Sequence, residues 1–373
     1  MKIALVHDYL MDYGGAEEVL YELHRMYPDA PIYVSLLDKQ KLGKFWSKFS
    51  DARIVTSWFQ YIPYASRVIS PLRFLLPLVW GSFDFSSYDV VITSASWAVT
   101  KGIRKGKHTK EICYLHTPPR YLYGYDTSRV WKGTWYGFLI DWYALIVNHA
   151  MRIYDFHQSQ KVDVFVANSK NVGERIEKFY RRNDYHVIYP PIEVDKFIDP
   201  NIKAKTGTYY LTGGRLVAAK NFDLIIKSCE KANVPLKIFG TGIEKEKLMN
   251  IAGKQVEFLG HITDEEKVAY MKGAKAFILA QKDEDFGITP IEAAACGVPS
   301  IAYKSGGYTE SISDKKTGLF FESLSVDALE KVIKESERMK WDKKIIIAHA
   351  EKFDVSLFQK KIRDIVEKIY HQK

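Results

Sequence analysis

The chain has 373 residues, of which 47% are hydrophobic and 27% are charged. This composition supplies ample apolar material for buried cores and excludes collagen-like, mucin-like and wholly disordered classes. At roughly 150 residues per domain, the length predicts two or three domains. The cysteines include no C-x-x-C pair. A disulfide framework or a cysteine-ligated zinc is therefore not expected. The cysteines instead suit a reducing compartment, so we expect a cytoplasmic location.

The net charge of +9 is concentrated in the first half of the chain. Residues 39–110 contain 12 Lys and Arg residues against three Asp residues, together with many aromatic residues. This mixture suits an anionic acceptor or an anionic membrane surface, to which the segments 67–80 and 131–142 would contribute. A solvated basic face over ordinary core aromatics explains the same pattern. No nucleic-acid motif accompanies the charge, so nucleic acid is not expected as a partner.

Short apolar runs alternate with helical patterns along the chain, which is the signature of β-α-β units and parallel sheets. In the first half, strands are predicted at residues 2–7, 32–35, 90–93, 112–115 and 164–167. In the second half, strands are predicted at residues 209–212, 236–239, 256–258, 276–280 and 300–302. The longest apolar stretches fall short of the ~18 residues that span a bilayer. The sequence therefore predicts an α/β protein with two Rossmann-like lobes.

The predicted hinge is Tyr189-Pro190-Pro191, because consecutive prolines lack N–H donors and fix an extended backbone. We expect an N-terminal lobe at residues 1–190 and a C-terminal lobe at residues 191–352. Residues 353–373 are expected to form a final amphipathic helix. Its expected buried face consists of Leu357, Ile362, Ile365, Val366 and Ile369.

Two loops of the first lobe follow predicted strands, at the edge where open α/β sheets hold ligands. The first loop ends in Gly14-Gly15-Ala16-Glu17 at a helix start, where the backbone can approach an anion closely. The second loop begins with His116-Thr117-Pro118, which places a hydrogen-bonding imidazole on a proline-stiffened segment. An ordinary turn and a structural histidine remain the simpler interpretations of each loop alone.

A third loop, in the second lobe, combines glycines with two cations. A predicted strand ends in Gly213-Gly214, Arg215 follows at once, and Lys220 comes five residues later at a helix start. A guanidinium fork and an ammonium beside a flexible turn suit a diphosphate. Either cation alone would be an ordinary surface charge.

The fourth loop carries two carboxylates around a helix start. Glu284 lies on the loop, and Glu292 lies in the first turn of the following helix. Thr289 is the expected N-cap, with Pro290 in the first helical turn. The N–H groups of residues 287–289 are expected to hold phosphate, and the carboxylates are expected to bind hydroxyl groups. Two solvated acids flanking a helix cap are the alternative.

Together these motifs resemble the retaining nucleotide-sugar glycosyltransferases of family 4. The resemblance rests on Gly14-Gly15-Ala16-Glu17, His116-Thr117-Pro118, Gly214-Arg215 with Lys220, and Glu284-x7-Glu292, and it covers almost the whole chain. The run Asp285-Phe286-Gly287-Ile288-Thr289-Pro290 is similar to the WbaZ-like mannosyltransferases of bacterial polysaccharide assembly.

This resemblance implies a GT-B fold, with two lobes facing a cleft and the last helix crossing back to the first lobe. It implies that Arg215 and Lys220 bind the donor diphosphate, that Glu284 contacts the transferred sugar, and that Glu292 contacts the ribose. His116 would act in catalysis on the sugar and acceptor side. The other implied donor-binding residues are Gly14, Gly15, His261, Ile262, Phe286, Gly287, Ile288 and Thr289.

The same resemblance implies hexose transfer with retention of anomeric configuration and without a cofactor or an active-site metal. GDP-mannose is the favoured donor, with a UDP-sugar as the alternative. The acceptor would be a glycan or a polyprenyl-diphosphate-linked glycan. The expected location is cytoplasmic, including the inner face of the plasma membrane.

Other interpretations of the motifs stay open. Asp283-Glu284-Asp285 could be a D-x-D clamp for Mg²⁺ or Mn²⁺, although Arg215 and Lys220 would then be redundant. Gly240-Thr241-Gly242 mimics part of a dinucleotide fingerprint but lacks the third glycine, which argues against a dehydrogenase. A sugar-nucleotide epimerase or a sugar phosphorylase is the enzymatic rival. A non-catalytic, membrane-docked scaffold is the alternative without chemistry.

Overall fold

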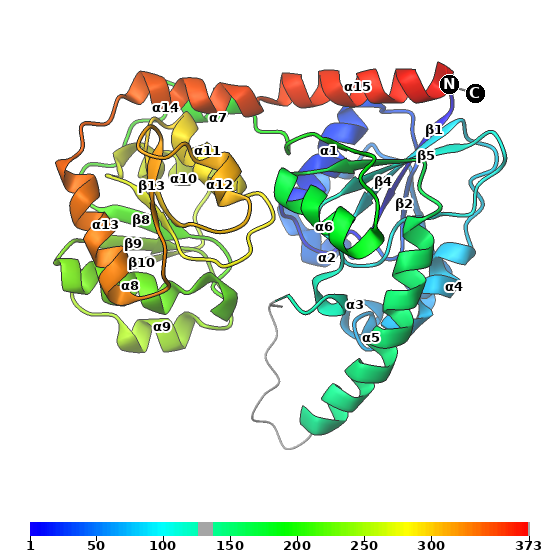
Figure 1. The fold of residues 1–373 in the computed structure, drawn as a ribbon, viewed down its shortest axis with the longest axis horizontal. Helices are drawn as coiled ribbons and strands as arrows, with labels where there is room; N and C mark the ends of the chain where they lie inside the picture. The colour runs from blue at the N-terminus through cyan, green and yellow to red at the C-terminus, as the bar shows by residue number, and fades with distance from the viewer. Residues whose placement is uncertain (126–136, 372–373) are drawn as a thin grey trace. The chain divides into compact units, whose positions relative to one another are not determined.

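The computed structural model describes residues 1–125 and 137–371. The chain divides into two compact units, of which the first consists of Met1–Pro191 with Ser356–Lys373 and the second of Ile192–Val355. Each unit is built around its own parallel sheet (Figure 1). The predicted α/β class with two Rossmann-like sheets is confirmed.

The first unit holds a sheet with the order β3-β2-β1-β4-β5-β6-β7. Its strands are β1 (Ile3–His7), β2 (Ile32–Val34), β3 (Ile54–Thr56), β4 (Val90–Ala95), β5 (Lys110–Leu115), β6 (Val164–Ala167) and β7 (Tyr185–Val187). Its α-helices are α1 (Gly15–Met26), α2 (Lys39–Leu42), α3 (Ala65–Val68), α4 (Leu76–Gly81), α5 (Gly137–Ser159), α6 (Lys170–Tyr180) and, from Ser356 on, α15 (Val355–His371).

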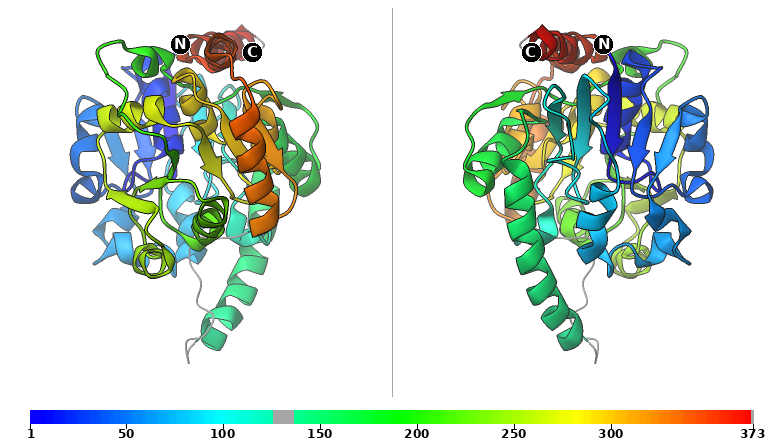
Figure 2. Two further views of the ribbon diagram at one scale, coloured as in Figure 1. Left: turned by 90° about the vertical axis from the view of Figure 1, so that its left-hand side faces the viewer. Right: turned by 90° about the vertical axis from the view of Figure 1, so that its right-hand side faces the viewer.

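Helices cover both faces of this sheet, as a parallel sheet requires. On one face, Leu5 and Ile92 pack with apolar residues of α1 and α15. On the other face, Val6 and Val91 pack with α3, α4 and Met151 of α5. The helix α5 packs against the unit along part of its length and extends away from the sheet at its N-terminal end (Figure 2).

The second unit holds a sheet with the order β10-β9-β8-β11-β12-β13. Its strands are β8 (Tyr210–Gly213), β9 (Leu236–Phe239), β10 (Val256–Gly260), β11 (Phe277–Leu279), β12 (Ser300–Tyr303) and β13 (Gly318–Phe321). Its α-helices are α7 (Val194–Ile198), α8 (Phe222–Ala232), α9 (Lys245–Ile251), α10 (Asp264–Gly273), α11 (Ile288–Ala295), α12 (Tyr308–Ser311), α13 (Val326–Arg338) and α14 (Lys343–Ala350). The helices α8, α9 and α13 share a core with one face, and α10 and α11 share a core with the other.

Ten strands of the described residues lie where the sequence predicts them, and all their ends agree to within two residues. The three strands that the sequence analysis missed are β3, β7 and β13, and each is an edge strand of its sheet. An edge strand is covered on fewer sides than a central strand, so its residues show a weaker apolar pattern. The half-buried residues of β3 and the half-buried or exposed residues of β7 fit this explanation, whereas three of the four residues of β13 are buried.

The final helix α15 packs in the core of the first unit through Phe358, Ile362, Val366 and Ile369. Leu357, which was expected on the buried face, is 41% exposed, so this expectation is wrong. Phe358 takes its place because the buried stripe begins one residue later.

Among the described residues, no helix is long and apolar enough to cross a bilayer. Of the segment 131–142, named in the membrane hypothesis, residues 131–136 lie outside the described part of the chain.

Candidate functional site

The predicted donor residues of the second unit lie at the point where its strand order reverses. The chain passes from β8 outward to β9 and β10, then returns through α10 to β11 on the other side of β8. The loops after β8 and β11 therefore diverge at the carboxyl edge of the sheet, the usual ligand position in open α/β sheets. Arg215 and Lys220 follow β8, and Glu284 follows β11.

The loop after β8 brings its lysine back against its own glycines. Gly214 has φ +118, and a Cβ atom built there would lie 2.8 Å from the ammonium nitrogen of Lys220. Asn221, next in the chain, adopts a left-handed conformation and donates from Nδ2 to the carbonyl of Ala280 at 2.8 Å. This hydrogen bond ties the lysine loop to the loop that carries Glu284.

The pKa of Lys220 is affected by both the cations and the carboxylates around it. Burial lowers the pKa of its ammonium below the usual value, Glu284 raises it, Arg215 and Lys267 lower it, and Glu292 raises it less strongly; the net direction is down. The hydrogen bond from Asn221 to Ala280 and the ion pair between Lys267 and Glu292 bring the elements that carry these charges to one edge of the sheet. Arg215 is exposed and Lys220 and Glu284 are half-buried, so the charges border solvent.

The Glu284 loop is held by close backbone packing against Gly306 and Gly307. The N–H of Gly307 donates to the carbonyl of Glu284 at 2.8 Å. A Cβ atom at Gly307 would lie 2.2 Å from Cα of Phe286, so only glycine allows this approach. Phe286 itself is buried and packs against Phe353, with ring centroids 5.6 Å apart. Phe286 therefore anchors the Glu284 loop to the core of the second unit.

The helix α11 begins two residues earlier than the sequence analysis expected. Its N-cap is Gly287, with φ +84, and no side chain caps it, so the assignment of Thr289 as N-cap is wrong. The reason is that glycine can adopt the left-handed turn that leads into the helix. The first N–H groups of a helix lack intrahelical partners, and Pro290 has no N–H group. The backbone amides available at this end of α11 are therefore those of Ile288 and Thr289.

Glu292 makes an ion pair that the sequence analysis missed. Its Oε2 lies 2.6 Å from Nζ of Lys267, which comes from α10. The helix α10 starts with a capping box, in which Glu266 N donates to Thr263 Oγ1 at 3.1 Å. The spacing of Glu292 and Lys267 in the sequence gave no sign of this pair.

The loops after β9 and β10 close the same edge of the sheet. The N–H of Gly240 donates to the carbonyl of Gly260 at 2.7 Å, and a Cβ atom at Gly240 would lie 1.9 Å from the carbonyl oxygen of Gly214. His261 and Ile262 follow Gly260 directly; His261 is exposed and Ile262 is half-buried. The Gly240 turn therefore serves backbone packing.

In the first unit, a buried hydrogen-bonded chain joins the two loops predicted there. Nε2 of His116 lies 2.8 Å from Oγ of Ser94, which lies 3.0 Å from Nδ1 of His7. Nε2 of His7 lies 3.4 Å from Oε1 of Glu17, whose other oxygen accepts from Gly14 N at 2.9 Å. His116 and the exposed Gly14-Gly15 turn are thus coupled through His7 and Ser94.

Burial lowers the pKa of His7, but its hydrogen bond to Glu17 and the charges of Glu17 and Asp8 outweigh this effect, so the net direction is up. The pairing with Glu17 therefore favours the protonated imidazole. Which atoms donate and which accept along these hydrogen bonds depends on the tautomers of His7 and His116.

Asp8, next to His7 in the chain, holds the loop after β4 through hydrogen bonds to its carboxylate. Its carboxylate accepts from Ser96 N at 3.1 Å, from Ser96 Oγ at 2.7 Å and from Trp97 N at 2.5 Å. The hydroxyl of Thr100 donates to its second oxygen. No role was predicted from the sequence for Asp8, His7 or Ser94, although His7 ends a predicted strand and Asp8 follows it directly. The partners of the Asp8 carboxylate come from the loop after β4, about 90 residues away in the chain.

The predicted residues thus gather in two groups, one in each unit. Arg215, Lys220, Glu284 and Glu292 share one edge of the second sheet, beside Phe286 and the start of α11. His116, Gly14 and Gly15 share the corresponding edge of the first sheet.

Comparisons with known proteins agree with this architecture. The family model "Glycosyltransferase Family 4" matches residues 13–196, and "Glycosyl transferases group 1" matches residues 193–353. A relative from Mycolicibacterium smegmatis, named GDP-mannose-dependent alpha-(1-6)-phosphatidylinositol monomannoside mannosyltransferase, is 32% identical over 166 residues. This alignment covers 38% of the chain and 44% of the relative, so the chain spans less than half of that protein.

Solved structures match over nearly the full length. Sucrose-phosphate synthase from Thermosynechococcus elongatus matches with a TM-score of 0.69 and 14% identity, covering 100% of both chains. Anabaena HepE in complex with UDP-glucose matches with a TM-score of 0.68 and 18% identity, covering 99% of this chain and 100% of the other. These likenesses show the shared two-sheet GT-B fold. Because the two family models together match residues 13–353, the chain belongs to the family 4 glycosyltransferases.

Proposed function

We propose that this protein is a retaining hexosyltransferase. It moves a hexose, with mannose favoured, from a nucleotide diphosphate sugar to a glycan or a polyprenyl-diphosphate-linked acceptor in bacterial surface polysaccharide synthesis. The observation that carries the proposal is the shared setting of Lys220, Arg215, Glu284 and Glu292 at the switch point of the second sheet. We assign donor binding to the second unit and acceptor binding to the first.

In this proposal the donor diphosphate lies against Arg215, Lys220 and the amides that start α11. The anomeric C–O bond to the diphosphate breaks, and a new bond to the acceptor oxygen forms on the same face of the sugar. The acceptor proton passes to the departing phosphate oxygen. The two cations and the helix N-terminus stabilise the negative charge that grows on the leaving group.

The carboxylates then serve recognition. Glu284 accepts hydrogen bonds from hydroxyl groups of the transferred sugar, with the backbone around Phe286 and Gly287 beside it. Glu292 binds the ribose while paired with Lys267, since a carboxylate has acceptor capacity for both. His261 and Ile262 border the nucleobase. His116 contacts the sugar, with Gly14 and Gly15 on the acceptor side.

GDP-mannose is favoured as the donor because the Mycolicibacterium smegmatis relative is named GDP-mannose-dependent. A UDP-sugar is the alternative. The basic first unit supports a peripheral location on the inner face of the plasma membrane.

A thermal-shift screen of GDP-mannose against UDP-glucose, with donor hydrolysis as a second readout, tests the proposal. A ligand at 100 times its dissociation constant should add about 2.7 kcal/mol of stability. We expect a shift with GDP-mannose and a smaller one with UDP-glucose. Product analysis should show the retained anomer, whereas an epimerase would convert the donor without an acceptor. No shift with any nucleotide sugar would contradict the proposal and favour a scaffold.

Metal independence is part of the same proposal, because Arg215 and Lys220 supply the positive charge that a divalent ion would bring. Turnover should survive EDTA. A strict requirement for Mn²⁺ would instead support a metal clamp at Asp283 and Asp285.

A further inference from the structure

The helix α5 is fixed to the first unit along one side. Asn148 Nδ2 donates to the carbonyl of Tyr121 at 3.1 Å, and Arg152 Nε donates to the carbonyl of Leu122 at 2.8 Å. Asp155 forms a fully buried ion pair with Lys101. These contacts fix the rotation of the helix about its axis and therefore determine which side chains face solvent.

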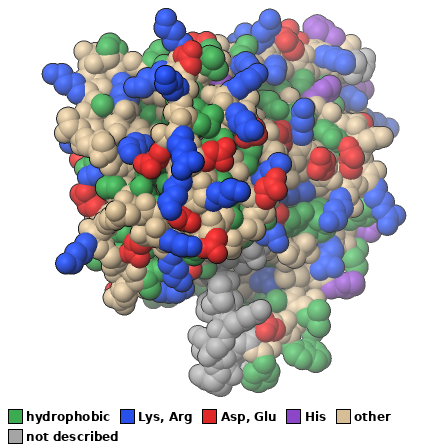
Figure 3. All heavy atoms as spheres, turned by 60° about the vertical axis from the view of Figure 1, so that its left-hand side comes forward, with side chains coloured by type: hydrophobic (Ala, Val, Ile, Leu, Met, Phe, Trp, Pro, Cys, Tyr) green, Lys and Arg blue, Asp and Glu red, His purple; other side chains and the backbone are tan. Residues whose placement is uncertain are grey.

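The opposite side of α5 is apolar and exposed. Trp142 is 66% exposed, Leu145 69%, Ile146 58% and Ile153 49%. The positions recur at helical spacing, so they form one stripe, together with exposed Phe138 near the helix start. Figure 3 shows hydrophobic side chains on the end of α5 that projects from the unit. A surface helix normally turns such a stripe toward the core, so an outward stripe of this size indicates an interaction site.

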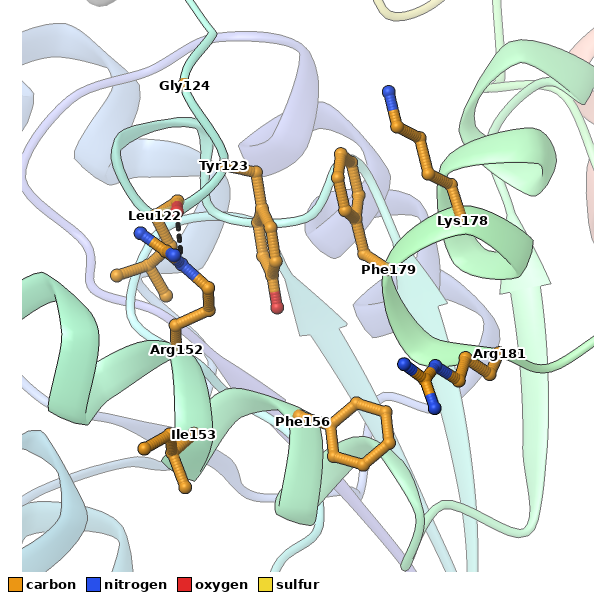
Figure 4. A pocket seen from close by; sticks show the side chains of 9 residues that line it. All are labelled: Leu122, Tyr123, Gly124, Arg152, Ile153, Phe156, Lys178, Phe179 and Arg181. Atoms are coloured by element: carbon orange, nitrogen blue, oxygen red, sulfur yellow. Dashed lines mark hydrogen bonds between the residues drawn. The ribbon is translucent and has the colours of Figure 1, made fainter.

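A groove of about 700 Å³ lies beside this stripe, between α5 and α6. Its aromatic wall consists of Tyr123, Phe156 and Phe179, and the rings of Tyr123 and Phe179 stack with centroids 4.2 Å apart. Ile153 lines the groove and also belongs to the stripe, which makes the two surfaces continuous. Figure 4 shows the groove residues on both helices and on the segment at Leu122.

Three cations line this groove: Arg152, Lys178 and Arg181. The described lining residues include no carboxylate at all. The hydroxyl of Tyr123 donates to Asp155 at 2.7 Å, so this buried acid near the groove is already paired with Tyr123 and Lys101. Two exposed residues of α5 are polar: Asp141, which is acidic, and His149, which comes about two helical turns later. The groove thus favours an anion.

The charge of the whole chain belongs to the same unit. The first unit has 29 Lys and Arg residues against 20 Asp and Glu residues, and the second unit has 25 of each. An anionic surface would attract the first unit and leave the second unit indifferent.

We propose that the stripe Trp142, Leu145, Ile146 and Ile153 docks this protein on an anionic phospholipid bilayer, while Lys178 and Arg181 bind lipid phosphates. The helix lies in the headgroup plane with its apolar side among the acyl chains. This inference deepens the peripheral location proposed above by naming its surface, and it does not depend on sugar transfer.

Flotation with vesicles of phosphatidylglycerol and phosphatidylcholine, compared with pure phosphatidylcholine, tests the stripe. The full chain should float with the anionic vesicles at low salt. The double variant Trp142→Ser/Ile146→Ser should bind them at least about ten-fold more weakly, because two apolar groups no longer leave water. The matched control is Ile243→Ser/Ile345→Ser, which changes residues of the second unit that are 74% and 51% exposed. The control should bind like the unaltered chain.

The double variant Lys178→Gln/Arg181→Gln tests the groove. Each cation near an anionic surface contributes about five-fold in binding, so losing both should weaken binding by about twenty-five-fold. Soluble glycerol phosphate at millimolar concentration should not reverse flotation if the bilayer is the ligand. Equal binding by all variants, or equal flotation with neutral vesicles, would overturn the proposal. So would a protein partner that binds the stripe in vesicle-free solution.

Donor hydrolysis is measured on the same samples. Lost flotation with intact hydrolysis locates the defect in docking, whereas lost hydrolysis with intact flotation locates it in the proposed function.

Discussion

The two sheets use their reversal points in different ways. Between β1 and β4, the first unit places Asp8, His7 and Ser94, all buried, and bonds them to groups of its own chain. Between β8 and β11, the second unit places Arg215, Lys220 and Glu284 at the border with solvent. The same topology therefore supports a rigid, internally bonded site in one unit and a charged site suited to a ligand in the other.

This difference predicts that equivalent substitutions act on different properties. In the first unit they should affect the free energy of unfolding, because they leave buried groups without partners. In the second unit they should affect activity at little cost in stability.

The largest expected effect is that of Asp8→Ala. The change leaves the two amides and two hydroxyls around Asp8 without their acceptor, so the free energy of unfolding should fall by about 3–5 kcal/mol. Urea denaturation measures this loss. Asp12→Ala, which alters an exposed neighbour, is the control and should stay within about 0.5 kcal/mol. A loss below about 1 kcal/mol for Asp8→Ala would remove the contrast between the units.

Lys220→Ala should act on turnover instead. Loss of a cation that stabilises the leaving group should lower kcat about 10²–10³-fold. The pKa of Lys220 is lowered, which means that folding disfavours its charged form. Removing it should therefore leave the free energy of unfolding unchanged or higher. Kinetics and urea denaturation on one preparation check both parts. Lys227→Ala, on the exposed side of α8, should change neither, and near-normal turnover in Lys220→Ala would refute the diphosphate assignment.

Gly307→Ala should have an intermediate effect on both properties. The added methyl would meet Cα of Phe286 at 2.2 Å, so the Glu284 loop must move. We expect a loss of about 1–3 kcal/mol in stability and weaker GDP binding by calorimetry. Gly81→Ala is the control, since nothing lies within 4 Å of its added methyl. Unchanged GDP binding in Gly307→Ala would show that the loop position does not matter for the donor.

The smallest effect should appear as pH dependence at His7. Because the pKa of His7 is raised in the folded state, its contribution to stability is fully present below the ordinary histidine pKa. The contribution disappears as the pH rises through the folded-state value. The difference in unfolding free energy between the unaltered chain and His7→Gln should therefore shrink from pH 5 to pH 8. A difference that grows with pH would show that burial, not Glu17, dominates at this histidine.

Much of this organisation could be predicted from the sequence. The central strands, the capping box at Thr263 and the loops that carry Arg215, Lys220 and Glu284 depend on local patterns of apolar, capping and glycine residues. Local patterns specify local structure, so they survive without knowledge of the fold. The edge strands β3 and β7 were not predicted because their burial is partial and their apolar pattern is correspondingly weak, whereas β13 is a largely buried run of only four residues.

Only the tertiary structure decided which distant groups meet. The pairing of Glu292 with Lys267, the chain from His116 through Ser94 to His7, and the four bonds to Asp8 all join segments that the sheets bring together. The tertiary structure also decides which side of α5 faces outward, because the helical period alone allows either side to face the core. Contacts with Lys101, Tyr121 and Leu122 select the side, and those partners lie 27 to 54 residues before the residues of α5 that they contact.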